Sequence, residues 1–259
     1  TAAELREDAG RVARIAVVGR VKSGKSTLVN AVIGRRVAPT DDRECTLVTT
    51  RYQYGAPERC EVRLLSGETR SMPLEDGALP RDLGGDIAEI EYTTVYLSCD
   101  ALRDFTLVDT PGLASTTAQA SEANKRYLFG ERQTENADAI LYAFRHAQFA
   151  DDSAALRALT ASRGAIGVLS FADVHTSPWG EADPLEAAAA DAAEIAARTP
   201  ELATVIPLAG RLAEAAKAGL IRETDAAALA GYADADEIDL ELGAAGDAGE
   251  LERLSDLLG

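Results

Sequence analysis

The 259-residue sequence predicts an α/β fold, with a mostly parallel central sheet flanked by helices on both faces. Short apolar runs rich in branched residues alternate along the chain with segments that favour helix. Two of these runs end in polar turns that contain glycine, at residues 19–26 and 109–112. The hydrophobic fraction of 46% is ordinary, and the chain is long enough for one large domain. In such a fold the ligand lies at the carboxyl ends of the strands.

Each expected element follows from its local pattern. Apolar or alternating runs predict strands at residues 14–18, 47–54, 60–65, 93–97, 105–109, 137–144, 165–171 and 204–208, with a hairpin return after residues 66–68. Helix-favouring segments predict a lead-in helix within residues 1–10, a helix that continues to Ile33 and stops at Gly34, and helices at 151–160, 184–198, 210–218, 223–231 and 248–258. Residues 73–90 are interrupted by prolines and glycines and are predicted to form a surface insertion.

The stretch from Gly19 to Ser26 has the pattern of a phosphate-binding loop: a glycine, four variable residues, then Gly-Lys-Ser. It follows a strand and opens a helix, so its N–H groups and the positive helix end face an anion. Lys25 places a cation against the β- and γ-phosphates, and the Ser26 hydroxyl suits Mg²⁺. The candidate nucleotide-binding residues of this loop are Gly19, Lys22, Ser23, Gly24, Lys25, Ser26 and Thr27.

A second motif, Asp109-Thr-Pro-Gly112, ends the apolar strand at 105–109. An aspartate at the carboxyl end of a strand beside a phosphate loop can hold Mg²⁺, usually through water. The backbone N–H of Gly112 can approach the γ-phosphate. The same four residues alone would also suit a common turn, but their place after an apolar strand favours the binding function.

The choice between guanine and adenine depends on groups that reach the base. Asp173 follows the strand at 165–171, and a carboxylate there can accept hydrogen bonds from guanine N1–H and the exocyclic amine. The usual GTPase signature at this place is Asn or Thr, Lys, any residue, Asp. Here Ser170 replaces the first residue and Phe171 replaces the lysine, whose stem packs over the base. A stacked Phe ring is one interpretation, and a plain helix cap at Asp173 is the alternative.

Composition excludes several other classes. The net charge of −17 argues against nucleic acid as a partner, and it disfavours direct contact of this segment with an anionic membrane. Three scattered cysteines and two histidines predict a reduced, intracellular chain without a zinc site. We expect no transmembrane span and no signal peptide, and a first residue that is not Met suggests a fragment or a processed product.

The chain resembles the dynamin-like GTPases, in particular bacterial members of the actinobacterial isoniazid-inducible type, from about residue 12 to about residue 232. The likeness is carried by residues 19–30, Pro39 with Glu44-Cys45-Thr46, residues 107–113 and residues 168–173. It implies the P-loop NTPase fold of a GTPase domain at 13–232, after a lead-in helix at 1–12. Residues 233–259 are then expected to be a helical extension toward a neck and stalk that this chain does not contain.

The resemblance also implies roles for individual residues. Thr46 is similar to the switch threonine that closes on Mg²⁺ and the γ-phosphate, with Thr49 and Thr50 as alternatives. The expected metal ligands are Ser26, Thr46 and Asp109, and the expected catalytic residues are Lys25, Thr46 and Lys22. Ser170, Asp173 and Gly210 are expected to contact the base.

Partners and location also follow from the resemblance. We expect GTP and GDP with Mg²⁺ as ligands, and a monovalent cation is possible. Residues 145–152 resemble the loop by which two such domains dimerise across their nucleotide faces. Membrane lipid would be contacted by regions absent from this chain, at the inner, cytoplasmic face of the cell membrane.

The sequence leaves open which group would supply charge and position water for hydrolysis. Leu113 stands where many small GTPases carry a water-orienting Gln, and Lys22 stands near the position at which animal dynamins hold a monovalent cation. The Lys22 ammonium could replace that cation, a group from a partner domain could do so, or Lys22 could simply face solvent.

Two functions also stay open. The chain is expected to be the GTPase domain of a membrane-remodelling enzyme, or alternatively a slow GTP-dependent switch or assembly factor.

Overall fold

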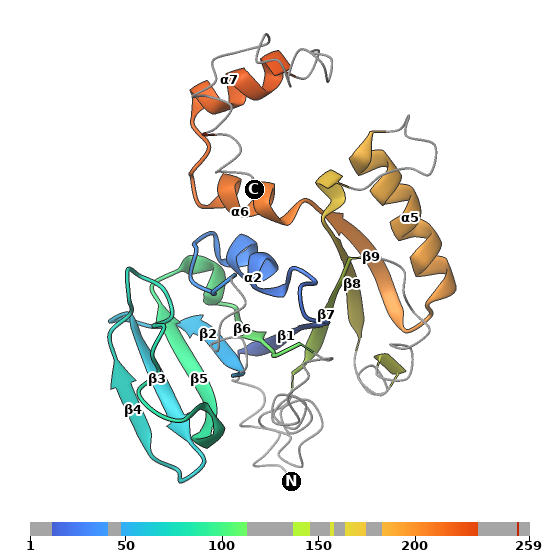
Figure 1. Cartoon of the computed structure of the whole chain (residues 1–259). Coiled ribbons are helices and arrows are strands. Elements are labelled where there is room, and N and C mark those ends of the chain that lie inside the picture. Colours follow the sequence, from blue (N-terminus) through green and yellow to red (C-terminus); the bar gives the residue numbers. More distant parts are fainter. Residues whose placement is uncertain are drawn as a thin grey trace.

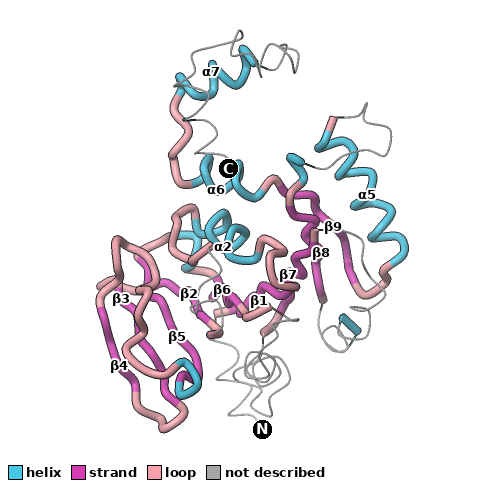
Figure 2. The backbone as a smooth tube through the Cα atoms, viewed as in Figure 1, coloured by secondary structure: helices cyan, strands magenta, loops and turns pink. Residues whose placement is uncertain are grey.

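The computed structural model describes residues 12–40, 48–112, 137–145, 156–157, 164–174, 183–232 and 253. The strands are β1 (Ala13–Gly19), β2 (Thr50–Tyr54), β3 (Arg59–Leu64), β4 (Thr69–Met72), β5 (Ile90–Leu97), β6 (Phe105–Asp109), β7 (Ala139–Phe144), β8 (Ala165–Ser170) and β9 (Leu202–Leu208). The longer helices are α2 (Lys25–Ile33), α5 (Pro184–Arg198), α6 (Gly210–Lys217) and α7 (Glu223–Tyr232). Figure 2 distinguishes these helices and strands along the backbone.

Where the structure describes the chain, the predicted strands and helices are present with small shifts at their ends. Helix α5 has the predicted bounds, and the hairpin of β3 and β4 is confirmed. Strand β2 begins at Thr50 rather than residue 47, and β5 and β9 begin earlier than predicted. Of the predicted helix at 151–160, Leu156 and Arg157 are described, and both are helical. The predicted lead-in helix lies outside the described residues, and so does the predicted helix at 248–258 apart from Arg253.

The described strands form one sheet in the order β4-β3-β5-β2-β6-β1-β7-β8-β9 (Figure 1). Strands β6, β1, β7, β8 and β9 are parallel neighbours, so their carboxyl ends meet at one edge. Strand β2 pairs antiparallel with β6, and Thr50 lies opposite Asp109. The sheet is therefore mostly parallel, as predicted, and its antiparallel pairs lie in the half that contains β2 to β5.

Two apolar cores pack on opposite faces of the sheet. Val17 of β1 belongs to the core that contains Val29 and Ile33 of α2. Its neighbours Ala16 and Val18 belong to the core that contains Ile195 of α5. Because successive side chains of a strand point to opposite faces, α2 and α5 cover different faces of the sheet. The prediction of helices on both faces is confirmed.

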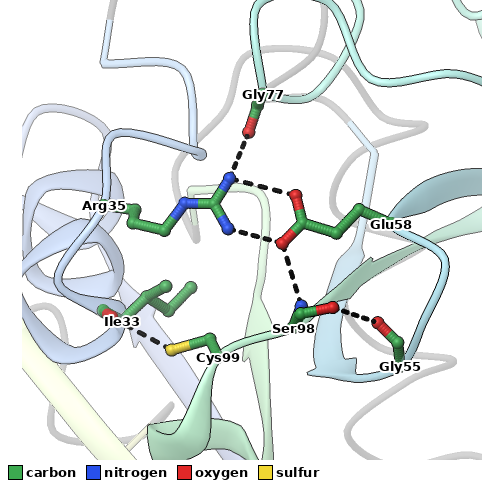
Figure 3. A network of polar contacts seen from close by, with 7 residues as sticks. All are labelled: Ile33, Arg35, Gly55, Glu58, Gly77, Ser98 and Cys99. Carbon is green, nitrogen blue, oxygen red and sulfur yellow. Dashed lines mark hydrogen bonds and ion pairs between the residues drawn. The ribbon is translucent and has the colours of Figure 1, made fainter.

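A polar network attaches the end of α2 to the antiparallel half of the sheet (Figure 3). The Arg35 guanidinium forms two hydrogen bonds with the Glu58 carboxylate, at 2.7 and 3.1 Å. Glu58 also accepts a hydrogen bond from the backbone N–H of Ser98, at 2.9 Å, and the Cys99 thiol donates to the carbonyl of Ile33. The hydrogen bonds from Arg35 lower the pKa of Glu58. The ion pair of Arg35 with Glu58 thus fixes the end of α2 to the loops that follow β2 and β5.

The loop after α2 is held by one buried amide. The side-chain oxygen of Asn30 accepts hydrogen bonds from the N–H groups of Val37 and Ala38, at 2.9 and 2.8 Å. Its nitrogen donates to the carbonyl of Ala38 at 3.0 Å. Both polar atoms of the Asn30 side chain are therefore used to bond the backbone of this loop. This arrangement sets the direction in which the chain leaves α2.

Helix α7 lies beyond α6, away from the sheet (Figure 1). Its Asp225 accepts two hydrogen bonds from Arg253, at 2.9 and 2.8 Å, and these bonds hold the pKa of Asp225 well below its usual range.

Among the described helices, none combines the length and the apolar character that crossing a membrane would need.

Candidate functional site

The phosphate loop joins β1 to α2 at the carboxyl edge of the sheet. A Cβ on Gly19 would lie 2.1 Å from the carbonyl oxygen of Ala143 in β7, so only glycine fits there. Gly24 precedes α2 with φ of 84°, the left-handed region that favours glycine. Neither a side-chain cap nor an acidic first-turn residue is described at this helix end. Its first N–H groups are therefore available for an anion.

Lys25 is the first residue of α2 and is 9% exposed. Its ammonium donates a hydrogen bond of 2.7 Å to the carbonyl of Arg20, within the loop itself. Burial lowers the pKa of Lys25, and the charge of Asp109 partly opposes this shift. A cation held in so little water interacts strongly with any anion that enters the loop.

Asp109 ends β6 beside the phosphate loop. Its Oδ2 accepts a hydrogen bond of 3.1 Å from the Ser26 hydroxyl. Its Oδ1 is buried and has no hydrogen-bond partner among the described residues. Burial raises the pKa of Asp109 to about 6, although Lys25 and Ser26 lower it in part. A buried carboxylate oxygen without a partner, next to a serine hydroxyl, has the chemistry of a site for a hard divalent cation such as Mg²⁺.

Gly112 closes against the phosphate loop. A Cβ at this position would lie 2.6 Å from Cγ2 of Val21 and 2.8 Å from its backbone nitrogen. The second motif is therefore in direct contact with the first, as its proposed approach to the γ-phosphate requires. Thr110 secures the turn, because its hydroxyl donates a hydrogen bond of 2.8 Å to the carbonyl of Val17 in β1.

The ends of β8 and β9 form the other side of the site. A Cβ on Gly24 would lie 3.1 Å from Oγ of Ser170, and a Cβ on Gly210 would lie 3.2 Å from Cγ2 of Thr27. Ser170 pairs with Leu208 in the sheet, so the two strand ends are adjacent. Asp173 is exposed within a short 3-10 helix, η5 (Ala172–Val174). The sheet thus brings Ser170 and Gly210 to the phosphate loop and places Asp173 three residues beyond Ser170.

Hydroxyl groups supply further polar atoms near the site. The side-chain oxygens of Ser23 and Thr49 are buried and lack a hydrogen-bond partner among the described residues. Thr50, in contrast, bonds with Thr93 through their hydroxyls at 2.8 Å. Of the two alternatives to Thr46, Thr49 therefore has the uncommitted oxygen. Thr46 itself and Leu113 lie outside the described residues.

Lys22 is exposed in the phosphate loop with φ of 63°. A second unusual backbone angle occurs at Phe171, with φ of 62°. The guanidinium carbon of Arg145 lies 4.4 Å from the centroid of the Phe171 ring. The sequence did not predict this contact, because no pattern signals that the ends of β7 and β8 bring these two side chains together.

Comparisons with known proteins agree with this geometry. A sequence model described as the dynamin family matches residues 15–163. The isoniazid-induced protein IniC of Mycobacterium tuberculosis is 32% identical over 240 residues, which cover 88% of this chain and 48% of IniC. The bacterial dynamin-like protein of Nostoc punctiforme is 28% identical over 151 residues, 53% of this chain and 21% of that protein. The chain spans about half the length of IniC.

Solved structures show the same fold. A structure of an oligomerised bacterial dynamin pair, described with the sensing and tethering of membranes, superposes with a TM-score of 0.54 and 19% identity. The superposition covers 79% of this chain and 32% of the other. At this identity the likeness concerns the fold alone.

The raised pKa of Asp109 predicts a specific pH dependence of stability. The folded state holds the Asp109 proton up to about pH 6, whereas an unfolded aspartate, with a pKa near 3.8, releases it earlier. Folding stability from this group is therefore fully present below about pH 4 and is lost as the pH rises through about 6. Asp109→Asn has no carboxyl group to titrate and so does not suffer this loss. The free energy of unfolding of the variant minus that of the wild type should therefore be larger at pH 7 than at pH 4, by about 1–3 kcal/mol.

Urea unfolding in EDTA, without nucleotide, measures this difference across the pH range. Asp104→Asn is the control, because Asp104 is exposed just before β6 and should follow the wild type. A constant difference between Asp109→Asn and wild type would contradict the assignment of a costly buried carboxylate.

Proposed function

We propose, because this chain belongs to the dynamin family, that it binds GTP with Mg²⁺ and hydrolyses the GTP to GDP and phosphate. The observation that carries this proposal is the convergence of the phosphate loop, Asp109 and Gly112 at one sheet edge. The buried Lys25 supplies a positive charge at that edge, and Asp109, whose Oδ1 has no hydrogen-bond partner within the described part of the chain, supplies a negative one. Both charges suit a triphosphate accompanied by a divalent cation.

The residues divide the work of binding. The N–H groups that begin α2 and the Lys25 ammonium bind the phosphates, and Asp173 reads the guanine edge. Ser26 and Asp109 hold Mg²⁺, with Thr46 or Thr49 as a further oxygen ligand. When bound, Mg²⁺ neutralises the charge that develops on the β- and γ-phosphates.

Removal of the Lys25 ammonium tests the binding site. Lys25→Ala should weaken GTP binding about 100-fold or more, because the phosphates lose their buried cation. Lys217→Ala, which removes an exposed lysine at the end of α6, should bind as the wild type does. Calorimetric titration with GTPγS and Mg²⁺ measures both variants. An absence of heat with the wild-type protein would refute guanine nucleotide binding altogether.

We assign to the Lys22 ammonium the positive charge that assists the hydrolysis step. The residue is exposed in the loop, near the position at which animal dynamins hold a monovalent cation, and Leu113 provides no water-orienting amide. We expect wild-type turnover to be similar in K⁺ and in Na⁺. Lys22→Ala should lower kcat about 10-fold or more and make it responsive to K⁺, since positive charge at this step can accelerate hydrolysis by ~10³–10⁵.

Phosphate release assays in the two salts provide the comparison, again with Lys217→Ala as control. A wild-type rate that depends strongly on K⁺ would show that a bound monovalent cation, and not Lys22, supplies the charge.

Membrane remodelling through dimerised GTPase domains, at the cytoplasmic face of the cell membrane, is the cellular role that we propose. It is supported by the family and by the bacterial dynamin pair described with membrane tethering. The leucine at position 113 favours a second candidate, a slow GTP-dependent switch without membrane remodelling. Such a switch would hold nucleotide for long periods between partners.

Liposomes separate the two candidates. The full-length protein should deform or tether anionic vesicles in the presence of GTP, as seen by electron microscopy, and Lys25→Ala should abolish the effect. Vesicles that stay unchanged while GTP is turned over slowly would instead support the switch.

A further inference from the structure

Phe171 has a backbone conformation that its position must enforce. It stands between Ser170, which ends β8, and the 3-10 helix that contains Asp173. Its φ of 62° lies in the left-handed region, which residues with a Cβ seldom adopt. The backbone N–H of Val174 donates a hydrogen bond of 3.2 Å to the Phe171 carbonyl and closes this turn. Such strain is a mark of functional segments.

The Phe171 ring lies between the phosphate loop and the end of β7. Its Cε2 is 3.7 Å from the place that a Cβ on Gly24 would occupy, so the ring edge adjoins the start of α2. The guanidinium carbon of Arg145 lies 4.4 Å from the ring centroid, within the range of cation–π contact. The ring itself is only partly buried. Arg145 is thus positioned over one face of an aromatic ring that borders the nucleotide site.

We infer that Phe171 is the platform on which the guanine ring stacks, and that Arg145 is a positioning residue that holds this platform from its other face. The inference rests on the proposed GTP binding and adds how the base is held. Asp173, two residues later, is exposed and can meet the hydrogen-bond donors of the base edge. Stacking and edge reading are therefore assigned to two different side chains.

This arrangement differs in its chemistry from a lysine stem over the base. An aromatic ring offers a flat, neutral surface that any purine can cover, so it contributes affinity without choosing between purines. The carboxylate of Asp173 must then provide the whole preference for guanine. Arg145 reaches no nucleotide atom in this assignment, because its guanidinium lies against the Phe171 ring.

Titration calorimetry with GDP and with IDP, both with Mg²⁺, tests the division of roles. IDP lacks the exocyclic amine of guanine but has the same stacking surface. Phe171→Leu should weaken both nucleotides about 10-fold or more, by the same factor. Asp173→Ala should instead bring the two affinities close together. Arg145→Ala should weaken both by about 2–5-fold.

Two further variants serve as controls for this experiment. Arg103→Ala removes a similar contact, in which a guanidinium carbon lies 4.0 Å from the ring centroid of Tyr54 far from the site, and should leave both affinities unchanged. Phe171→Trp should restore binding if Phe171→Leu fails to fold or to bind. Wild-type affinities in Phe171→Leu, or a loss confined to GDP, would overturn the inference while leaving GTP binding intact. A wild-type protein that binds neither nucleotide would refute the proposed function instead.

Discussion

The site depends on two opposite charges kept where water hardly reaches them, the ammonium of Lys25 and the carboxylate of Asp109. Burial favours the neutral form of each group, so it lowers the pKa of Lys25 and raises the pKa of Asp109. Each charge partly compensates the other, but an oxygen of Asp109 still lacks a partner among the described residues. The fold therefore carries a local cost that a phosphate chain and its cation would relieve, which links binding to stability.

That cost is tolerable because the surrounding frame is well packed. Strand β1, from which the phosphate loop emerges, has apolar contacts on both of its faces. Helix α2 is fixed at its far end by Arg35 and Glu58, and the loop after it is fixed by Asn30. The two charged groups thus occupy defined positions, since the elements that hold them cannot easily move apart.

Much of this arrangement could be predicted from the sequence, because the two motifs each have a strict local pattern. The spacing from Gly19 to Ser26 and the apolar run before Asp109 predicted a phosphate loop and its neighbouring strand, and the structure places them in contact. The order of the strands could not be predicted, because β2 lies between β5 and β6 although it precedes both in sequence. The contact of Arg145 with Phe171 could not be predicted either, because it depends on where the side chains that follow β7 and β8 are placed. The role of Asn30 in holding the loop after α2 was not predicted either, because no sequence pattern indicates that a buried amide side chain will bond the backbone of residues 37 and 38.

The direction of β2 has a consequence for how such a domain can diversify. Because β2 runs antiparallel to β6, its first residue, Thr50, lies beside the last residue of β6, Asp109. The connection from α2 to β2, which includes residues 41–47, therefore ends at the edge of the sheet that carries Asp109. Changes in the length or chemistry of that connection would leave the pairing of Thr50 with Asp109 in place, because loop closure depends only weakly on length. The connection can therefore vary among related domains while the strand pairing beside it stays the same.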